Sequence, residues 1–328
     1  MPAITRRAVM AAGAALVAWS AGAVAVAQEP QRLRFSAVFS EQDIRAEMMK
    51  RFAEEVKKDF TIQPYLGGTL FKQGTELVAM QRGNLEMSNI APQDISNQIP
   101  AWSIVTSAYL FRDADHLKKV FASDVGQQLR KLASDQLGIH ILGPTYYGSR
   151  QVGLRVAKKI GTPADMAGIK LRMPGGEAWQ FLGEAIGANP TPMAYAEVYT
   201  GLQTGAIDGQ DNPLPNVQNM KFYEVMKQIA LTSHLVAFDL LAVSNKVWNA
   251  MPPQQQAAFQ AAADRAIEWS TQQHVKREDE LAAFFKAQGL DVYTPDVKAF
   301  REHAQKKYLA SDLAKGWIPG MLDRINAL

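Results

Sequence analysis

Hydrophobic and polar residues follow two different periods along the chain, and these two periods alternate. Segment 33–39 alternates as a β-strand does, whereas Met48, Met49, Phe52 and Val56 in segment 44–58 fall on one helical face. The pattern predicts further strands at 61–66, 85–90, 139–142 and 169–172, and further helices at 77–82 and 117–137. Turn residues are predicted to end the helix 77–82 at 83–84 and the strand 139–142 at 143–144. This order is typical of an α/β protein with largely parallel sheets.

The turn-forming segments that follow Tyr147 indicate that a second α/β unit begins there. Segment 162–166 reads as a helix N-cap turn, and Pro174-Gly175-Gly176 breaks the pattern after the strand 169–172. Segment 254–288 has the longest helical periodicity. At about 1.5 Å per residue this helix would reach roughly 50 Å, enough to run across two units.

The N-terminus reads as an export signal. Arg6-Arg7 precedes an uncharged run, Ala8 to Ala27, that ends in the small-x-small pattern Ala25-Val26-Ala27. This predicts a signal peptide over residues 1–27, and Thr5-Arg6-Arg7 resembles a twin-arginine signal. The alternative is an uncleaved anchor, because an uncharged run of this length could span a bilayer. We expect a bacterial periplasmic protein that begins at Gln28.

Composition excludes several classes of protein. The chain has 328 residues of which 47% are hydrophobic, too many for a disordered protein. It has no cysteine, which excludes disulfides, thiolate catalysis and cysteine-ligated zinc. Without Arg6 and Arg7 there are 33 basic and 32 acidic side chains. A nucleic-acid-binding protein would show a strongly basic face, so we expect no nucleic-acid partner.

Known catalytic and metal-binding motifs are absent from the sequence. There is no G-x-S-x-G, Walker, G-x-G-x-x-G or H-E-x-x-H motif, and the five histidines are widely separated. Segment 208–212 superficially resembles a calcium loop, but it lacks the third oxygen ligand and the terminal glutamate. We therefore expect no cofactor and no metal.

From Tyr147 onward the chain resembles the solute-binding subunits of TRAP (tripartite ATP-independent periplasmic) transporters, of the DctP type. The segments that carry the resemblance are 148–151, 168–174, 187–193, 197–199, 202–213, 221–225 and 243–245. The resemblance implies an α/β, two-lobed periplasmic binding protein with hinge strands and a long bent helix spanning both lobes. It places residues 28–148 and 237–278 in lobe I, and residues 149–236 and 279–328 in lobe II.

The resemblance also implies a binding site. Arg172, in the segment Leu171-Arg172-Met173-Pro174, stands where the family clamps the ligand carboxylate, and a guanidinium fork matches a carboxylate bidentately. Arg150 and Asn212 stand where the family lines its cleft. By position in the sialic-acid-binding branch, His234 and Asp239 would be cleft residues and Tyr195 an aromatic wall. We expect no catalytic residue.

The sequence departs from the sialic-acid-binding branch at the sugar contacts. Asn89 and Ala91 replace an aromatic and an acidic residue, and Asp94 replaces a basic one. Sialic acid is therefore disfavoured. Asn89, together with Asn212, His234 and Asp239, would give a polar cleft that suits a hydroxylated acid, either a sugar acid or a hydroxy-dicarboxylate.

The expected function is capture of an organic acid by domain closure. The resemblance implies delivery to membrane permease subunits driven by an ion gradient, and we expect the protein to be a monomer and not an enzyme. Two alternatives stay open. The chain could be the ligand-binding subunit of a sensor, or a secreted α/β enzyme acting on a carboxylated substrate with His234 or Asp239 as general base.

Overall fold

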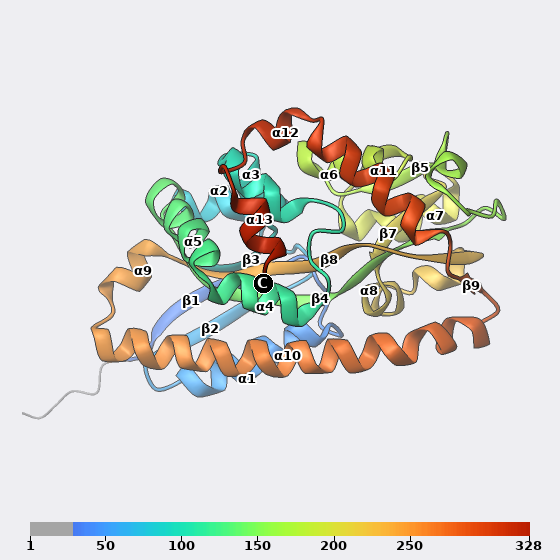
Figure 1. Cartoon of the computed structure of the whole chain (residues 1–328). Helices are drawn as coiled ribbons and strands as arrows, with labels where there is room; N and C mark the ends of the chain where they lie inside the picture. The colour runs from blue at the N-terminus through green and yellow to red at the C-terminus, as the bar shows by residue number, and fades with distance from the viewer. Residues whose placement is uncertain (1–28) are drawn as a thin grey trace, which may run out of the picture.

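A computed structural model describes residues 29–328, and one nine-stranded mixed sheet extends through both of its lobes (Figure 1). The sheet order is β2-β1-β3-β8-β4-β7-β5-β6, with β9 beside β8. The strands are β1 (Gln31–Ser36), β2 (Phe60–Tyr65), β3 (Met87–Ile90), β4 (Ile139–Leu154), β5 (Lys170–Met173), β6 (Asn189–Pro192), β7 (Gly209–Pro213), β8 (Gln228–Ser244) and β9 (Asp291–Tyr293). The predicted signal peptide lies outside the described residues.

Strands β4 and β8 join the two lobes. They pair antiparallel along their lengths of 16 and 17 residues, which at about 3.3 Å per residue span roughly 50 Å. Strands β1, β2 and β3 extend the sheet in lobe I, and β5, β6 and β7 extend it in lobe II. The prediction of two lobes with hinge strands is confirmed. The prediction of largely parallel sheets holds for the pairs β1–β2, β1–β3, β5–β6, β5–β7 and β8–β9, but the pairs β3–β8, β4–β8 and β4–β7 are antiparallel.

Each lobe has helices on both faces of its sheet, because side chains on successive strand positions point to opposite faces. In β8, Phe238 and Leu240 enter one core of lobe I while Leu241 and Val243 enter the other. The helices on the lobe I faces are α1 (Ile44–Val56), α2 (Glu76–Gln81), α3 (Pro92–Ser96), α4 (Ala114–Ala122), α5 (Asp124–Leu137) and α9 (Asn245–Ala250). Those of lobe II are α6 (Glu177–Ala185), α7 (Val198–Thr204), α8 (Leu214–Asn219) and α11 (Val297–Leu309), and α12 (Asp312–Lys315) follows α11. Short 3-10 helices lie at Pro100–Thr106, Pro163–Met166, Tyr195–Glu197 and Phe222–Val225.

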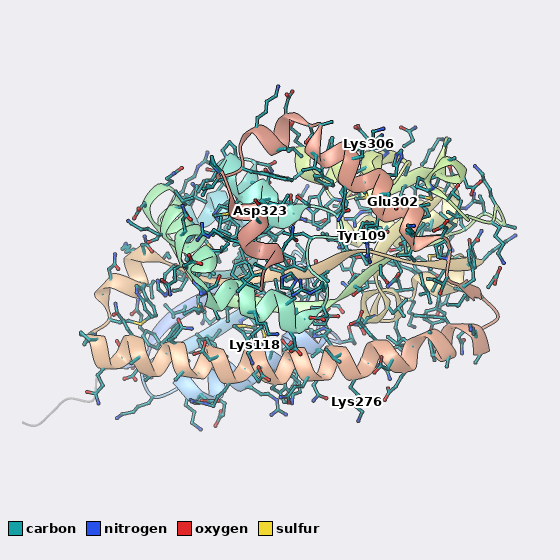
Figure 2. All side chains as sticks on the ribbon, viewed as in Figure 1. Tyr109, Lys118, Lys276, Glu302, Lys306 and Asp323 are labelled. Atoms are coloured by element: carbon teal, nitrogen blue, oxygen red, sulfur yellow. The ribbon has the colours of Figure 1, made fainter. Side chains whose placement is uncertain are left out.

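The long helix α10 (Pro253–Ala287) runs along one face of both lobes (Figure 1). Phe259 and Ala266 pack into lobe I, whereas Leu281 and Phe285 pack into lobe II. Lys276 on its outer face points away from the body of the protein (Figure 2). The predicted helix across both lobes is confirmed. None of the helices within residues 29–328 combines the length and the apolar character that a bilayer crossing needs.

The C-terminal helix α13 (Met321–Asn326) returns to lobe I. Met321 and Ile325 are fully buried in a lobe I core, and His116 Nε2 lies 2.9 Å from the carbonyl oxygen of Ile325. These residues fall in the range that the sequence analysis places in lobe II. The exact lobe boundaries remain a prediction, but α13 packs with the first lobe.

Two predicted elements differ from the structure. The helix predicted at 117–137 is two helices, because Ser123 ends α4 and caps α5 by accepting a hydrogen bond from the amide of Val125. The strand predicted to end at Gly143-Pro144 continues to Leu154. The pairing with β8 shifts between Ile141 and Gly143, so these two residues mark an irregularity of a continuing strand rather than its end.

Candidate functional site

A cavity lies between the two lobes, where loops after the strands meet. Its side chains come from three sources. Lobe I contributes Phe39, Arg45, Gln73, Glu76, Asn89 and Asp94; lobe II contributes Arg172, Trp179, Tyr195, Asn212 and Asn216; the crossing strands contribute Tyr147, Arg150 and Asp239.

Arg172, on β5, is a buried cation without an anionic partner. Only 1% of the residue is exposed, and its guanidinium donates from Nε to the Met193 carbonyl (2.9 Å) and from Nη2 to Gln73 Oε1 (3.0 Å). Both acceptors are neutral, and within residues 29–328 no carboxylate forms an ion pair with this arginine. Burial, followed by the charge of Arg150, lowers the pKa of Arg172 to about 10. The cavity therefore presents a positive charge that lacks a counter-ion.

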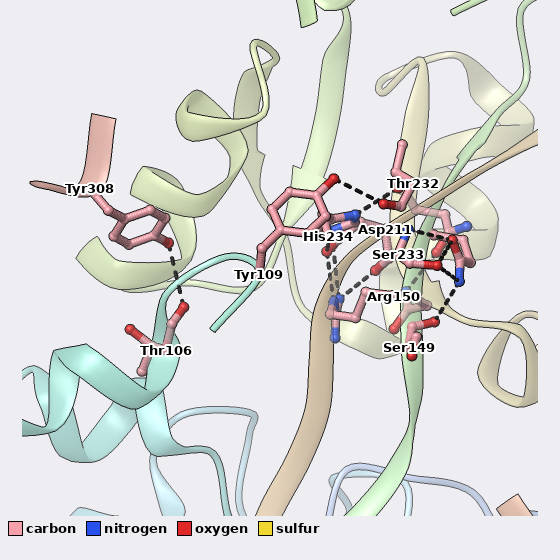
Figure 3. Close-up of polar contacts among 12 residues, drawn as sticks. Thr106, Tyr109, Ser149, Arg150, Asp211, Thr232, Ser233, His234 and Tyr308 are labelled. Atoms are coloured by element: carbon pink, nitrogen blue, oxygen red, sulfur yellow. Dashed lines mark hydrogen bonds and ion pairs between the residues drawn. The ribbon is translucent and has the colours of Figure 1, made fainter. Parts of the chain in front are cut away.

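Arg150, on β4, is neutralised by the protein itself. Its Nε donates to Asp211 Oδ2 (2.6 Å), and His234 Nε2 lies 3.1 Å from the same oxygen (Figure 3). His234 Nδ1 in turn lies 2.8 Å from the hydroxyl oxygen of Thr232. Burial opposes ionisation of Asp211, but Arg150 and the bond to His234 hold the pKa of its carboxyl below the usual range. The cluster fixes the guanidinium of Arg150 at the cavity wall, where it also stacks on Trp179 with 4.8 Å between Cζ and the ring centroid.

A second buried arginine, Arg45 on α1, holds the lobe I side of the cavity. Its Nη1 donates to Asp239 Oδ2 (2.6 Å), while Nε and Nη2 each donate to the Asp43 carboxylate (2.9 Å). Its Cζ lies 4.5 Å from the ring centroid of Phe39 and 4.1 Å from that of Tyr147. Arg45 is thus shared between two carboxylates. Asp239 nevertheless has a pKa raised to about 6, because burial outweighs the attraction of Arg45.

Two further acidic side chains, Glu76 and Asp94, line the same side of the cavity. Burial raises the pKa of Glu76 to about 8, with the charge of Asp94 adding to the effect. Burial and the charge of Asp239 raise the pKa of Asp94 to about 7. Near neutral pH these groups are therefore only partly ionised in the empty cavity.

The structure brings six of the seven predicted ligand-binding residues to the cavity: Arg172, Arg150, Asn212, Tyr195, Asp239 and Asn89. Asn212 on β7 donates to Gln210 Oε1 (2.6 Å), and Asn89 on β3 donates to the hydroxyl of Thr145 (3.1 Å). The Tyr195 hydroxyl accepts from Asn216 Nδ2 (3.1 Å), which fixes the ring beside Arg172.

The structure differs from the prediction for His234. This residue is completely buried, does not line the cavity, and uses both ring nitrogens in contacts with Asp211 and Thr232. Its strand explains the difference: His234 lies on β8, which β4 separates from the β7 strand of Asp211, and its ring contacts the Asp211 carboxylate instead of the cavity. His234 therefore acts on the site by holding Asp211, which holds Arg150.

The sequence analysis did not identify Arg45, Gln73, Glu76 and Asn216 as cavity residues. It noted Asp94 only as a difference from the sialic-acid-binding branch. Arg45 lies on a helix whose periodicity indicates only a buried face, and Gln73 and Glu76 lie in or beside a loop without a motif. One signal was present. Asn89 lies near the end of the short strand β3 and Asp94 follows it, and ligands of α/β sheets bind at the carboxyl ends of strands.

No cluster that could hold a metal ion occurs in the part of the chain that the structure describes. In the segment 208–212, which superficially resembles a calcium loop, residues 209–212 belong to strand β7, and Asp211 pairs with Arg150. The expectation that the protein uses no metal and no cofactor stays a prediction.

The sequence matches the model of one protein family over most of its length. Residues 35–312 match the family DctP, described as bacterial extracellular solute-binding protein, family 7. The sialic acid-binding periplasmic protein SiaP of Vibrio cholerae is 32% identical over 268 residues, which cover 81% of this chain and 83% of that protein.

Solved structures of similar proteins have the same fold. A TRAP periplasmic solute-binding protein from Roseobacter denitrificans, with bound 3-deoxy-D-manno-oct-2-ulosonic acid (KDO), superposes with a TM-score of 0.90 at 45% identity and covers 91% of this chain and 99% of its own. A second TRAP periplasmic solute-binding protein, from a Polaromonas species and bound to D-erythronate, superposes with a TM-score of 0.83 at 26% identity. The match covers 91% of this chain and 99% of that chain.

Proposed function

The chain belongs to bacterial extracellular solute-binding protein family 7, the DctP family, and from this premise we propose how it captures its ligand. As a TRAP solute-binding protein, it takes up an organic acid in the cavity between its lobes. The ligand carboxylate is held by Arg172, and its hydroxyl groups meet the polar side chains around it. The ligand of the Roseobacter denitrificans relative, KDO, is a hydroxylated acid of this kind.

The observation that carries the proposal is the missing counter-ion of Arg172. A buried charge is costly unless it is paired, and the arginines Arg45 and Arg150 of the same cavity each have a carboxylate partner. Arg172 has no carboxylate partner in the described part of the chain, so a ligand carboxylate is the group that would neutralise its charge. Such a charge-assisted hydrogen bond contributes about 1.5 to 3 kcal/mol.

Around this carboxylate we assign supporting roles to the other cavity residues. Arg150, fixed by Asp211 and His234, adds positive potential, and Tyr195 forms a wall beside Arg172. Asn212, Asn89 and Asp239 offer hydrogen-bonding groups to hydroxyls. Because these residues come from both lobes, a ligand that touches all of them favours the closed arrangement.

The closed form would be recognised by the membrane permease subunits of a TRAP transporter, in keeping with export to the periplasm. A binding role is favoured over an enzymatic one by the contacts of the two candidate general bases. His234 is completely buried against Asp211 and does not reach a ligand in the cavity. Asp239 lines the cavity, but its carboxylate already accepts a hydrogen bond from Arg45 Nη1 (2.6 Å).

The test is a thermal-shift screen of the protein from Gln28 onward against sugar acids, hydroxy acids, dicarboxylates, keto acids and aromatic acids. Ligand at about 100 times its dissociation constant adds roughly 2.7 kcal/mol of stability. We expect hydroxylated acids to raise the melting temperature of the wild type and of Arg82→Ala, an exposed arginine of lobe I, but not of Arg172→Ala. A shift that survives in Arg172→Ala, or one given only by apolar aromatic acids, contradicts the proposal.

A further inference from the structure

The charges around the cavity are unevenly divided between the lobes. On the lobe II side, Arg172 carries one uncompensated positive charge, since the nearby Arg150 and Asp211 cancel. On the lobe I side, one positive group, Arg45, faces the two carboxylates of Asp43 and Asp239. Glu76 and Asp94 stand on that side without a basic partner in the described residues, so the lobe I side has the excess of acidic groups.

Two amide oxygens that line the cavity have no hydrogen-bond donor within residues 29–328. One is Oδ1 of Asn216 in lobe II, a residue that is only 3% exposed. The Oδ1 atom of Asn89 is likewise without a partner in the described chain. The carboxyl group of Asp94 accepts no hydrogen bond from any described residue. The two buried amide oxygens are costly until a donor reaches them, and the residues that the structure describes supply none.

We propose that Glu76, Asp94 and Asp239, here called the acidic wall, select the ligand by accepting hydrogen bonds from its hydroxyl groups and by repelling a second carboxylate. The ligand is then a polyhydroxylated acid with a single carboxylate, held at one end by Arg172 and at the other by the acidic wall and the amide oxygen of Asn89, while the amide oxygen of Asn216 in lobe II accepts from a further hydroxyl. This inference rests on the proposed function, because it takes Arg172 as the carboxylate site.

Hydroxyl groups fit the acidic wall for a simple reason. A hydroxyl can donate to a carboxylate, to a carboxylic acid or to an amide oxygen, whereas a carboxylate can donate to none of them. The raised pKa values of Glu76 and Asp94 show that negative charge is already disfavoured at this wall. A further anion would have to be accommodated by protonation, at a cost in affinity.

The repulsion is large enough to decide between two ligands. A second carboxylate about 5 Å from one ionised wall residue, at the effective dielectric constant of about 20 found in proteins, would weaken binding roughly 100-fold or more. A sugar acid and the dicarboxylate formed by replacing its terminal CH2OH with a carboxylate differ in this feature alone. Their affinity ratio therefore measures the acidic wall directly.

The experiment is isothermal titration of the wild type, Asp94→Asn, Glu76→Gln and Arg172→Ala. The monocarboxylates are D-galactonate, D-erythronate and KDO; the dicarboxylates are galactarate and meso-tartrate, the matched partners of the first two. Asp135→Asn, an exposed aspartate of lobe I, is the control. At about pH 9, where Glu76 and Asp94 are ionised, we expect the wild type to prefer monocarboxylates about 100-fold or more, and Asp94→Asn and Glu76→Gln each to strengthen dicarboxylate binding about tenfold or more relative to the control.

The outcomes separate the two proposals. If a dicarboxylate binds as tightly as the best monocarboxylate, or if both wall variants leave the ratio unchanged while Arg172→Ala abolishes binding, the acidic wall is overturned and the proposed function stands. If Arg172→Ala binds as the wild type does, or if no acid binds the wild type, the proposed function fails. If one wall variant does not fold, the other variant still tests the acidic wall, together with the ratio of monocarboxylate to dicarboxylate affinity in the wild type.

Discussion

Nη2 of Arg172 in lobe II donates a 3.0 Å hydrogen bond to Oε1 of Gln73 in lobe I. The same oxygen accepts a 2.9 Å bond from the backbone amide of Tyr195, which also belongs to lobe II. One side chain of lobe I therefore connects, across the cavity, to both Arg172 and Tyr195. We expect closure of the lobes and formation of the proposed site to be coupled through Gln73.

Replacing Gln73 by alanine should weaken both closure and binding. The variant loses two hydrogen bonds between the lobes, one of them to a charged group, so we expect ligand affinity to fall about tenfold. Small-angle X-ray scattering should show a larger radius of gyration for the ligand-free variant. Gln81→Ala is the matched control, because Gln81 is exposed and bonds only to Gln98 within lobe I. Unchanged affinity and size in the Gln73 variant would contradict the coupling.

Replacing Asp211 by asparagine should destabilise the whole protein. The substitution leaves the buried guanidinium of Arg150 without its counter-ion and changes the partner of His234. Breaking a buried ion pair on one side costs about 3 to 5 kcal/mol. Urea denaturation of the ligand-free protein measures this loss, with Asp135→Asn as the control. A loss of less than about 1 kcal/mol would mean that the Arg150 charge is supported by other groups.

The stability of the ligand-free protein should fall as the pH rises from about 6.5 to about 8.5. Burial raises the pKa of Glu76 from 4.5 to about 8 and that of Asp94 from 3.8 to about 7. The folded protein then binds more protons than the unfolded chain in this interval, so stability present at low pH is lost as these groups ionise. His140 and His274, whose pKa values burial lowers from 6.5 to about 4, have the opposite effect, but at lower pH.

The measurement is the free energy of unfolding by urea at several pH values across this range. Glu76→Gln removes one of the two groups and should reduce the slope, whereas Glu302→Gln, on the exposed face of α11, should not. An equal slope in the wild type and in Glu76→Gln would show that other groups titrate there.

Replacing Gly148 by alanine should strain the crossing strand β4. Gly148 has φ of 121°, and an added Cβ would lie 2.7 Å from Pro213 Cβ and 2.9 Å from Glu278 Oε1. The Glu278 carboxylate accepts hydrogen bonds from the Ser149 amide (2.5 Å) and from the Tyr146 hydroxyl, so it connects α10 to β4 at this point. We expect a loss of about 2 to 4 kcal/mol in urea denaturation.

Gly161→Ala is the control for this loss, because Gly161 has an ordinary φ and the nearest atom to an added Cβ is 3.4 Å away. A Gly148 variant as stable as the control would show that β4 can rearrange without cost at this position.

The sequence predicted the order of strands and helices because most elements show their own periodicity. It also led to Arg172, Arg150 and Asn212 through motifs, and all three line the cavity. Gln73, Glu76 and Asp94 could not be found in this way, because their role depends on lobe I facing lobe II, which no local pattern encodes. The place of His234 outside the cavity could not be predicted for a related reason. Whether the side chain of a strand residue faces a cavity or a carboxylate of another strand depends on how β8, β4 and β7 pack together.

Lobe I is built from separated parts of the chain, and this affects the order in which the protein can be made. Ile90 of β3 pairs with Leu240 of β8, which the ribosome adds 150 residues later. The N-terminal strands therefore emerge during synthesis without the strand that completes their sheet, while the segment that forms most of lobe II lies in between. Lobe I is begun first and finished last, so its unpaired edge is the part of the nascent chain that most needs protection from aggregation until β8 has been synthesised.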